Sequence, residues 1–375
     1  MAGYDKSGSY NFKSLEKKYG NFLSPTFQIK VGGFKLDSAK IPVSHLQIQL
    51  STENRAGMCS FTVEAMYNYE TGVWSDGFLD KVDVGMKVVV EIGYADAQRQ
   101  VFLGYVDKYR IDYSSQGAPQ LHISAMDGLG VLMSNREKVD FGKRKTTDVV
   151  KQLVSACTKA GIINSSTVDN LPSFEGQFVK EKASSSYDFL CRIAEMCFVN
   201  FCIINGELMF SNLMKNTSTL LELTMGVSLI EFSKMVGFSQ QTVGSVTVIS
   251  NGTVDKQEVR GKADAPSRYG DSSGKTGAEK WKALDGANKD VVMNFLKSAD
   301  ECKTVAQNIL DSMSLGFVQG EGRCIGIPEI IPGRYIKLAG LDRETNGSYF
   351  ITEVTHTFSA DGFFTEFEVK GFRSR

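Results

Sequence analysis

The sequence predicts an α+β protein that is mainly β and that uses one antiparallel β-module twice. Apolar residues alternate with polar ones through much of residues 26–128 and again towards the end of the chain, which is typical of half-buried antiparallel strands. The apolar period lengthens to a helical one within residues 129–213. Residues 82–128 and 329–375 share one plan, in which a glycine precedes an alternating strand and two further strands separated by a polar turn.

Composition narrows the functional class. The chain has 375 residues, which allows two to four domains. Its net charge of −1 gives no basic excess of the kind that general nucleic-acid binding requires. Residues 1–20 are polar and do not resemble a signal peptide, and no run approaches the ~20 apolar residues that span a bilayer. We therefore expect synthesis in the cytoplasm without a signal peptide, no direct membrane insertion and no specific nucleic-acid binding.

The first half of the chain begins with residues 1–24, which we expect to form a mobile or partner-docking arm. Six alternating sets then follow before residue 128, each bounded by turn residues. Six strands in about 100 residues favour a small barrel or sandwich. The apolar sets are Phe27, Ile29 and Val31; Leu46, Ile48 and Leu50; Cys59, Phe61, Val63 and Ala65; Met86, Val88, Val90 and Ile92; Tyr109, Ile111 and Tyr113; and Leu121, Ile123 and Ala125.

Residues 129–213 predict a compact α+β unit. Thr146 or Thr147 is a candidate cap for a first helix that ends near Gly161, and Ser185 with Asp188 forms a capping-box pattern for a second. A buried strand, an Asn205-Gly206 turn and a partner strand complete the unit.

Strand patterning resumes at residues 220–224, 230–235, 245–250 and 256–260. Residues 261–288 are polar and predict a loop or insertion. A third helix is expected to begin at Ser298, with Glu301 completing a capping pattern, and to end at Gly316. The final β-module follows.

The repeat rests on two pairs of glycines. Gly85 precedes MKVVVEI as Gly333 precedes RYIKLAG, and Gly104 opens YVDKYRIDY as Gly347 opens SYFITEVTHTF. The two segments share little sequence identity. In the last strand the face opposite the apolar one places Phe364 beside Glu366, Glu368 and Lys370, which offers a surface to a partner.

No catalytic, cofactor or metal motif stands out. The seven cysteines contain no Cys-x-x-Cys pair and are expected to be buried free thiols, and the three histidines His45, His122 and His356 have no metal-ligand spacing. The GDSSGKTG run at residues 270–277 has Tyr269 where the phosphate-binding loop requires glycine. The sequence therefore predicts a protein that is not an enzyme, with no cofactor, and names no individual interface residues.

The order of these segments resembles the late control protein D family, the baseplate hub proteins of contractile phage tails, and is similar to the N-terminal hub region of the type VI secretion protein VgrG. The resemblance lies in the TTDVVKQLVSACTKAGI helix, the SSYDFLCRIAEMCFVNFCIINGELMF unit and the PGRYIKLAG, GSYFITEVTHTF and GFFTEFEV ending. It covers most of the chain from about Thr26.

The resemblance implies two similar β-barrel tube domains, at residues 25–128 and at 214–260 with 320–375. It also implies an α+β accessory domain at 129–213 and an inserted loop and helix at 261–319. Hubs of this kind are trimers, so three chains would present six similar modules to a hexameric inner tube on one side and a trimeric spike on the other. Because the sequence ends at Arg375 without a spike segment, we expect a separate spike protein.

The implied partners are a homotrimer, the inner tube protein, the spike, baseplate wedge proteins and, as a further candidate, a tape-measure protein. Residues 261–297 are a candidate contact to the wedge or spike. The expected location is a phage tail, a phage-tail-like bacteriocin or another injection particle. Two alternatives remain open: a tail-tip cell-wall hydrolase, and a β-rich receptor- or carbohydrate-binding module.

Overall fold

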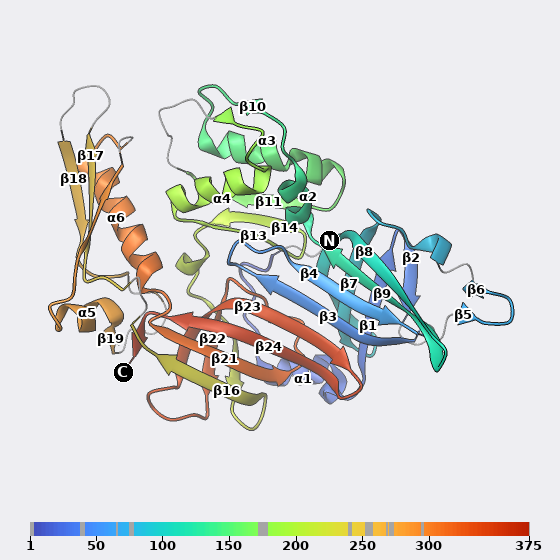
Figure 1. Ribbon diagram of the computed structural model, residues 1–375. Helices are drawn as coiled ribbons and strands as arrows, with labels where there is room; N and C mark the ends of the chain where they lie inside the picture. The colour runs from blue at the N-terminus through green and yellow to red at the C-terminus, as the bar shows by residue number, and fades with distance from the viewer. Residues whose placement is uncertain are drawn as a thin grey trace.

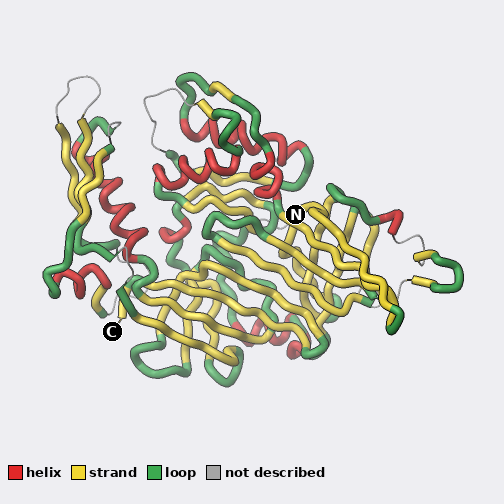
Figure 2. The backbone as a smooth tube through the Cα atoms, viewed as in Figure 1, coloured by secondary structure: helices red, strands yellow, loops and turns green. Residues whose placement is uncertain are grey.

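A computed structural model describes residues 4–37, 42–64, 67–74, 79–171, 179–238, 242–251, 258–267, 269, 274–293 and 296–374. Most of its strands belong to one large 13-stranded sheet (Figures 1 and 2). Along the sheet the order is β16 (Leu229–Val236), β21 (Val318–Ile325), β24 (Gly362–Gly371), β23 (Gly347–Ser359), β3 (Val43–Ser51), β4 (Met58–Val63), β9 (Gly117–Met126), β8 (Ala97–Ser114), β7 (Lys87–Tyr94), β1 (Pro25–Val31) and β2 (Phe34–Asp37). β22 (Tyr335–Ala339) also pairs with β23, and β15 (Thr219–Thr224) pairs with β22.

The sheet contains the same strand order twice. In the first copy the order is β1-β7-β8-β9-β4-β3, and in the second copy it is β15-β22-β23-β24-β21-β16. The copies differ in one pairing direction, since β1 runs antiparallel to β7 whereas β15 runs parallel to β22, and only the first copy has an additional outer strand, β2, among the described residues. The copies are joined by pairing of β3, the outer strand of the first copy, with residues 353–358 of β23, which β22 leaves uncovered. Within the described residues the strand path stays open, from β16 to β2, so no closed barrel is formed and the two barrels that the sequence led us to expect are not confirmed.

The two copies also share backbone detail at their central turn. Gly85 and Gly333 have φ angles of 84° and 82°, a region that favours glycine. The N–H of Gly85 donates to the carbonyl of Val106, and the N–H of Gly333 donates to that of Ile351, both at 2.8 Å. Each acceptor residue donates back to the residue after the glycine. The predicted equivalence of these two glycines therefore holds at the level of hydrogen bonds.

The second pair of glycines is not equivalent. Gly104 pairs with Val88 on β7, whereas Gly347 pairs with Leu338 on β22, two residues further along its strand. The position that corresponds to Gly104 is Tyr349. The sequence pattern was misleading because glycine marks different places in the two strands, the middle of β8 and the start of β23.

A β-bulge that both copies share determines which residues correspond in the second halves of β8 and β23. The β8–β9 ladder shifts register between Val106 and Lys108, and the β23–β24 ladder shifts between Ile351 and Glu353. A bulge adds one residue to one strand and so changes the position of every later pair. Because both copies carry it at the same place, residues 108–113 of β8 correspond to residues 353–358 of β23.

The alternation of apolar and polar residues correctly predicted which faces of β3 and β7 are buried. Leu46, Ile48 and Leu50 of β3 are buried, as are Val88 and Val90 of β7, in one core that extends through both copies. The expected apolar face of β8 differs in its second half, where Tyr109 and Tyr113 are 38% and 61% exposed.

The α+β unit has its own core and lies above the sheet in Figure 1. Ser185 and Asp188 form the predicted capping box, and Asn205-Gly206 forms the predicted turn with positive φ at both residues. The predicted cap of the earlier helix is wrong, because Thr146 is its first helical residue and Lys145 precedes it without a side-chain cap. The elements are α2 (Gly128–Ser134), β10 (Val139–Asp140), α3 (Thr146–Lys159), β11 (Ser165–Val168), β12 (Val179–Lys180), α4 (Ser186–Cys197), β13 (Asn200–Ile204) and β14 (Glu207–Ser211).

The insertion is larger than the sequence suggested. β17 (Val246–Asn251) and β18 (Glu258–Ala263) were expected in the second barrel, but they form a separate sheet with β20 (Lys289–Val292) and pack on α6 (Ala299–Ser314). Their alternation is that of any half-buried strand, so it did not reveal which sheet they join. The short elements β19 (Lys275–Thr276) and α5 (Gly277–Lys282) complete the insertion, and β19 pairs with β25 (Arg373–Ser374). Residues 270–273 of the GDSSGKTG run lie outside the described residues.

The described part of the N-terminal arm docks on its own chain. α1 (Phe12–Lys18) buries Leu15, and the Tyr19 that follows is 1% exposed. The buried guanidinium of Arg334 donates to backbone carbonyls of Asp5 and Gly8. The arm therefore packs as part of the core, which the polar sequence of residues 1–24 had not indicated.

Candidate interaction surfaces

The second copy ends in an open strand edge. β16 pairs with β21 on one side, and no strand among the described residues pairs with its other side. Large apolar side chains are exposed along this strand and just beyond it: Ile230 (42%), Met235 (59%), Val236 (43%) and Phe238 (43%). Open strand edges with exposed apolar residues are sites where another strand can add.

The first copy has a matching open edge on β8. β7 accompanies β8 only as far as Tyr105, so residues 108–114 pair with β9 alone among the described strands. The equivalent half of β23, residues 353–358, is covered by β3. In that covered strand Val354 and Phe358 are buried, whereas their counterparts Tyr109 and Tyr113 are exposed. Residues 108–113 of β8 are thus an open edge, whereas the equivalent residues of β23 are covered within the same chain.

An aromatic hairpin stands at the end of this edge. β5 (Tyr67–Asn68) and β6 (Val73–Trp74) place the Tyr67 ring against Tyr69, Trp74 and Tyr113, with centroids 5.2–5.7 Å apart. The Tyr69 hydroxyl donates to the carbonyls of Ser114 and Gly117 at the β8–β9 turn. The hairpin therefore fixes the tip of β8 while leaving the edge itself open.

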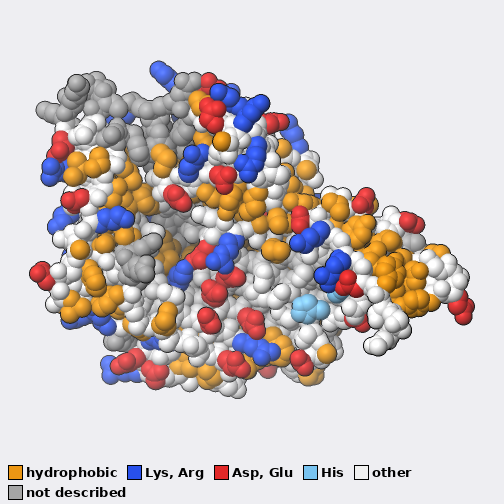
Figure 3. Space-filling view, in the orientation of Figure 1, with side chains coloured by type: hydrophobic (Ala, Val, Ile, Leu, Met, Phe, Trp, Pro, Cys, Tyr) orange, Lys and Arg blue, Asp and Glu red, His pale blue; other side chains and the backbone are white. Residues whose placement is uncertain are grey.

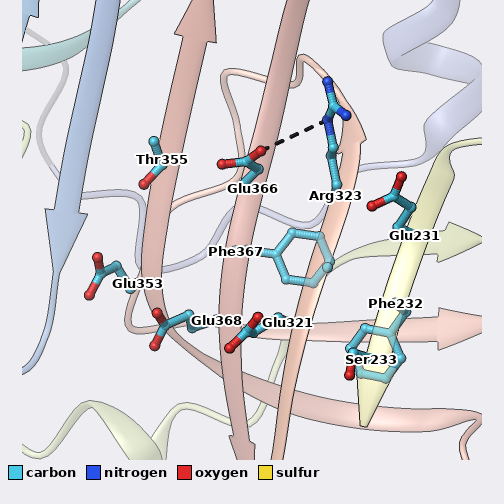
Figure 4. A pocket seen from close by; sticks show the side chains of 11 residues that line it. Glu231, Phe232, Ser233, Glu321, Arg323, Glu353, Thr355, Glu366, Phe367 and Glu368 are labelled. Atoms are coloured by element: carbon cyan, nitrogen blue, oxygen red, sulfur yellow. Dashed lines mark ion pairs between the residues drawn. The ribbon is translucent and has the colours of Figure 1, made fainter.

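One face of the second copy is hollowed and acidic (Figures 3 and 4). A hollow of about 550 Å³ opens over β16, β21, β24 and β23. Its lining residues are Glu231, Phe232, Ser233, Glu321, Gly322, Arg323, Glu353, Thr355, Glu366, Phe367 and Glu368. Five of these are glutamates and one is an arginine, so the hollow carries a net negative charge.

The contacts inside the hollow only partly balance this charge. Arg323 lies 3.9 Å from Glu366, and its guanidinium lies over the Phe364 ring. Arg55 reaches Glu353 at 3.2 Å from the first copy. Burial raises the pKa of Glu353, and the nearby charge of Glu368 adds to that rise. The repulsion between Glu353 and Glu368 is the part of this rise that a further cation beside them would relieve.

The corresponding face of the first copy is not acidic. The shared register gives each glutamate of the hollow a counterpart there, and none of the five counterparts is acidic. Glu231, Glu321, Glu353, Glu366 and Glu368 correspond in order to His45, Ser60, Lys108, His122 and Ser124. In Figure 3 acidic side chains gather over the second copy, and histidine appears over the first.

The sequence pointed to part of this surface. It singled out Glu366 and Glu368, which do line the hollow, and Phe364, which packs under Arg323. Glu231, Glu321 and Glu353 were missed, because they come from three other strands and their proximity depends on the strand order.

The histidines and cysteines are not assembled into a catalytic group in the described structure. His122 bonds Thr62 and lies 3.1 Å from Asp112, while His356 is fully buried beside Thr365. No cluster of metal-ligand residues occurs among the residues described. All seven cysteines are free thiols, as predicted, and all except the half-buried Cys191 are buried. None of the described helices has the length and apolar character needed to cross a bilayer.

Comparison with known proteins identifies the family. Residues 23–360 match the family model described as the Alg8 N-terminal domain. The chain belongs to this family. No curated protein matches its sequence significantly.

Solved structures with the same fold as this chain come from phage tails and from a secretion system. A 43 kDa tail protein of prophage MuSo2 from Shewanella oneidensis has a TM-score of 0.67 at 14% identity, over 92% of this chain and 98% of that one. A tail protein from Neisseria meningitidis scores 0.63 at 14% identity, over 93% and 97%. A type VI secretion component from E. coli scores 0.51 at 10% identity, over 91% and 76%. The chain therefore has a tail- or baseplate-type fold, while membership of the late control protein D family stays a prediction.

Proposed function

We propose that the chain is a structural baseplate hub of a contractile tail or related injection system. Three copies would form a ring that joins a six-fold inner tube to a three-fold spike. One observation carries this proposal: the module occurs twice, and the half-strand that β3 covers in β23 is left open at the equivalent place in β8. The fold shared with phage tail and secretion proteins supports it. The number three rests on the resemblance to hub proteins.

The junction inside one chain provides a template for the junction between chains. Inside the chain, β3 pairs with residues 353–358 of β23, with Leu46 opposite Phe358 and Leu50 opposite Val354. β16 is the counterpart of β3, and residues 108–113 are the counterpart of residues 353–358. Pairing β16 of one chain with β8 of the next in the same register places Phe232 opposite Tyr113 and Val236 opposite Tyr109.

This pairing would bury side chains that are exposed in a single chain. Tyr109, Tyr113 and Val236 would enter the apolar layer that Val354, Phe358 and Leu50 form at the inner junction. Each chain has one edge of each kind, so the contact is heterologous and can close a ring. We expect the ring to bury on the order of 2,000 Å² or more per obligate interface. The sheets of the three chains would then join into one closed barrel.

The remaining roles follow from this arrangement. The ring would contact the inner tube protein on one side and a spike protein on the other, and its channel would pass cargo or a tape-measure protein. The insertion, which packs as its own unit around α6, is the candidate contact to wedge or spike proteins. The role is structural and not enzymatic, and the hydrolase and carbohydrate-binding alternatives gain no support from the residues described.

A designed disulfide tests the ring directly. The proposed register places Ser233 of one chain opposite Asp112 of the next, and directly opposed residues in antiparallel strands have Cβ atoms about 4.5–5.5 Å apart. A chain carrying both S233C and D112C should form linked trimers under oxidising conditions, seen on a non-reducing gel. The matched control is K234C with D112C, because residue 234 projects from the opposite face of β16 and should link poorly.

Light scattering provides the second measurement. Each chain has a mass of 41.2 kDa, and we expect the wild-type particle to have three times this mass. A chain that stays monomeric at high concentration, alone and with its spike, and that forms no S233C–D112C link, would overturn the proposal.

A further inference from the structure

We propose that the acidic hollow of the second copy selects the β8 edge of another chain through the cationic side chain of Arg110. This inference rests on the ring proposed above and concerns the specificity with which the β16 edge of one chain pairs with the β8 edge of the next. The occupant of the β16 edge is therefore a second copy of this chain, recognised by charge as well as by strand pairing.

The hollow offers more negative charge than the chain itself balances. Glu366 and Glu353 have cationic neighbours, Arg323 and Arg55 respectively. In the described structure no ion pair joins the other three glutamates of the hollow, Glu231, Glu321 and Glu368, to a cation. Like charges gathered in a partly enclosed surface favour the approach of a cation.

The β8 edge supplies that cation at a defined place. Lys108 and Arg110 correspond to Glu353 and Thr355, two residues that line the hollow, so they lie on the same face of the sheet in the first copy. The Arg110 side chain is 72% exposed and bonds Asp112 at 2.8 Å. Asp112 also lies 3.1 Å from the Nε2 of His122, so it keeps a partner in its own chain when Arg110 turns towards another carboxylate.

The proposed register brings Arg110 close to one glutamate in particular. Arg110 lies opposite Met235 and diagonally across from Ser233, whose partner on the next strand is Glu321. Neighbouring strands lie about 4.8 Å apart, so β21 lies about 10 Å from β8. A long arginine side chain can extend over the small Ser233 to reach the Glu321 carboxylate, whereas the short Asp112 cannot.

The same charges oppose the wrong pairings. Two β8 edges would bring Lys108 and Arg110 of one chain against their own copies. Two β16 edges would bring Glu231 and the acidic hollow of one chain next to those of the other. Like charges across paired strands are destabilising, and specific interfaces combine such repulsion with attraction to the correct partner. The asymmetry between the copies thus favours head-to-tail association and disfavours isolated edge-to-edge dimers.

A charge exchange tests the inference. R110E and E321K should each weaken self-association about tenfold at 100 mM salt, measured by sedimentation velocity over a concentration series. The double variant R110E/E321K should return to within about threefold of the wild type, because each interface again pairs opposite charges. K151E, which makes the same charge change at an exposed position of α3, should leave association unchanged. Wild-type association should weaken as salt rises, because salt screens exposed charges.

The outcomes separate this inference from the ring itself. If R110E and E321K associate like the wild type while the S233C–D112C link still forms, the ring stands and charge selection is wrong. If both single variants weaken association and the double variant does not recover, the specific Arg110–Glu321 contact is wrong. Circular dichroism of each variant checks that it is folded, and R110Q, which removes the charge without reversing it, should give a smaller loss than R110E.

Discussion

Acid should destabilise the junction between the two copies through His356. This residue lies on β23 opposite Ile48 of β3, and its side chain is fully buried. Its Nδ1 lies 2.9 Å from the Thr365 hydroxyl, whose oxygen accepts the N–H of Ile327. The hydroxyl proton is therefore free to donate to Nδ1, which requires a neutral ring. Burial lowers the pKa of His356 to about 3.

The sign and size follow from proton linkage. In the unfolded chain the pKa of a histidine is about 6.5. Below that pH the unfolded chain binds a proton that the folded chain refuses until the pH approaches the folded pKa. Stability is therefore lost as the pH falls from about 6.5 towards 3, at about 1.4 kcal/mol per pH unit. At pH 5 the loss from His356 amounts to about 2 kcal/mol.

The substitution His356→Gln removes this titration and keeps an acceptor for the Thr365 hydroxyl. Urea denaturation followed by far-ultraviolet circular dichroism gives the free energy of unfolding of wild type and variant at pH 7 and at pH 5. The loss between the two pH values should be about 2 kcal/mol smaller in the variant. His122→Gln is the matched control, because that ring is partly exposed. An equal acid loss in wild type and His356→Gln would refute the reasoning.

Two further predictions concern the turn and the arm. Gly85→Ala should lower the free energy of unfolding by about 1–2 kcal/mol, because alanine is strained at positive φ. Gly333→Ala should lower it more, because the new Cβ would also lie 2.8 Å from the Leu213 side chain. At Gly85 no atom lies within 4 Å of the new Cβ. Equal losses on urea denaturation would contradict this. Arg334→Met should lower the free energy of unfolding by about 2–4 kcal/mol, because the backbone carbonyls that accept from the buried guanidinium lose their donor. Limited proteolysis of this variant should cut the N-terminal arm first. An arm as resistant to proteolysis as that of the wild type would count against the docking role of Arg334.

Local features were predictable where they depend on neighbouring residues. The capping box at Ser185 and the turn at Asn205 follow from side chains that bond the adjacent backbone or tolerate positive φ. The buried faces of β3 and β7 follow from alternation, because successive side chains of a strand point to opposite faces. The helical capping expected at Thr146 failed, since a helix can begin without a side-chain cap.

The partners of each strand were not predictable in the same way. Alternation identifies the face that a strand buries but is silent about the strand beside it, so β17 and β18 were placed in the wrong sheet. It also marked Tyr109 and Tyr113 as core residues, although they lie at an edge that a single chain leaves open. The glutamates of the hollow come from four strands, and only their order in the sheet brings them together.

The sequence by itself determined that a β-module recurs, and it located one true anchor of the repeat, the glycines Gly85 and Gly333 whose φ angles their turns require. Tertiary structure decided how the copies meet. β3 and β23 lie about 300 residues apart in the chain, and they pair in a register that places Leu46 opposite Phe358 and Leu50 opposite Val354 in one buried apolar layer. Such long-range pairing depends on which edges remain free once each copy has folded, which is a property of the assembled sheet and not of any local run of residues.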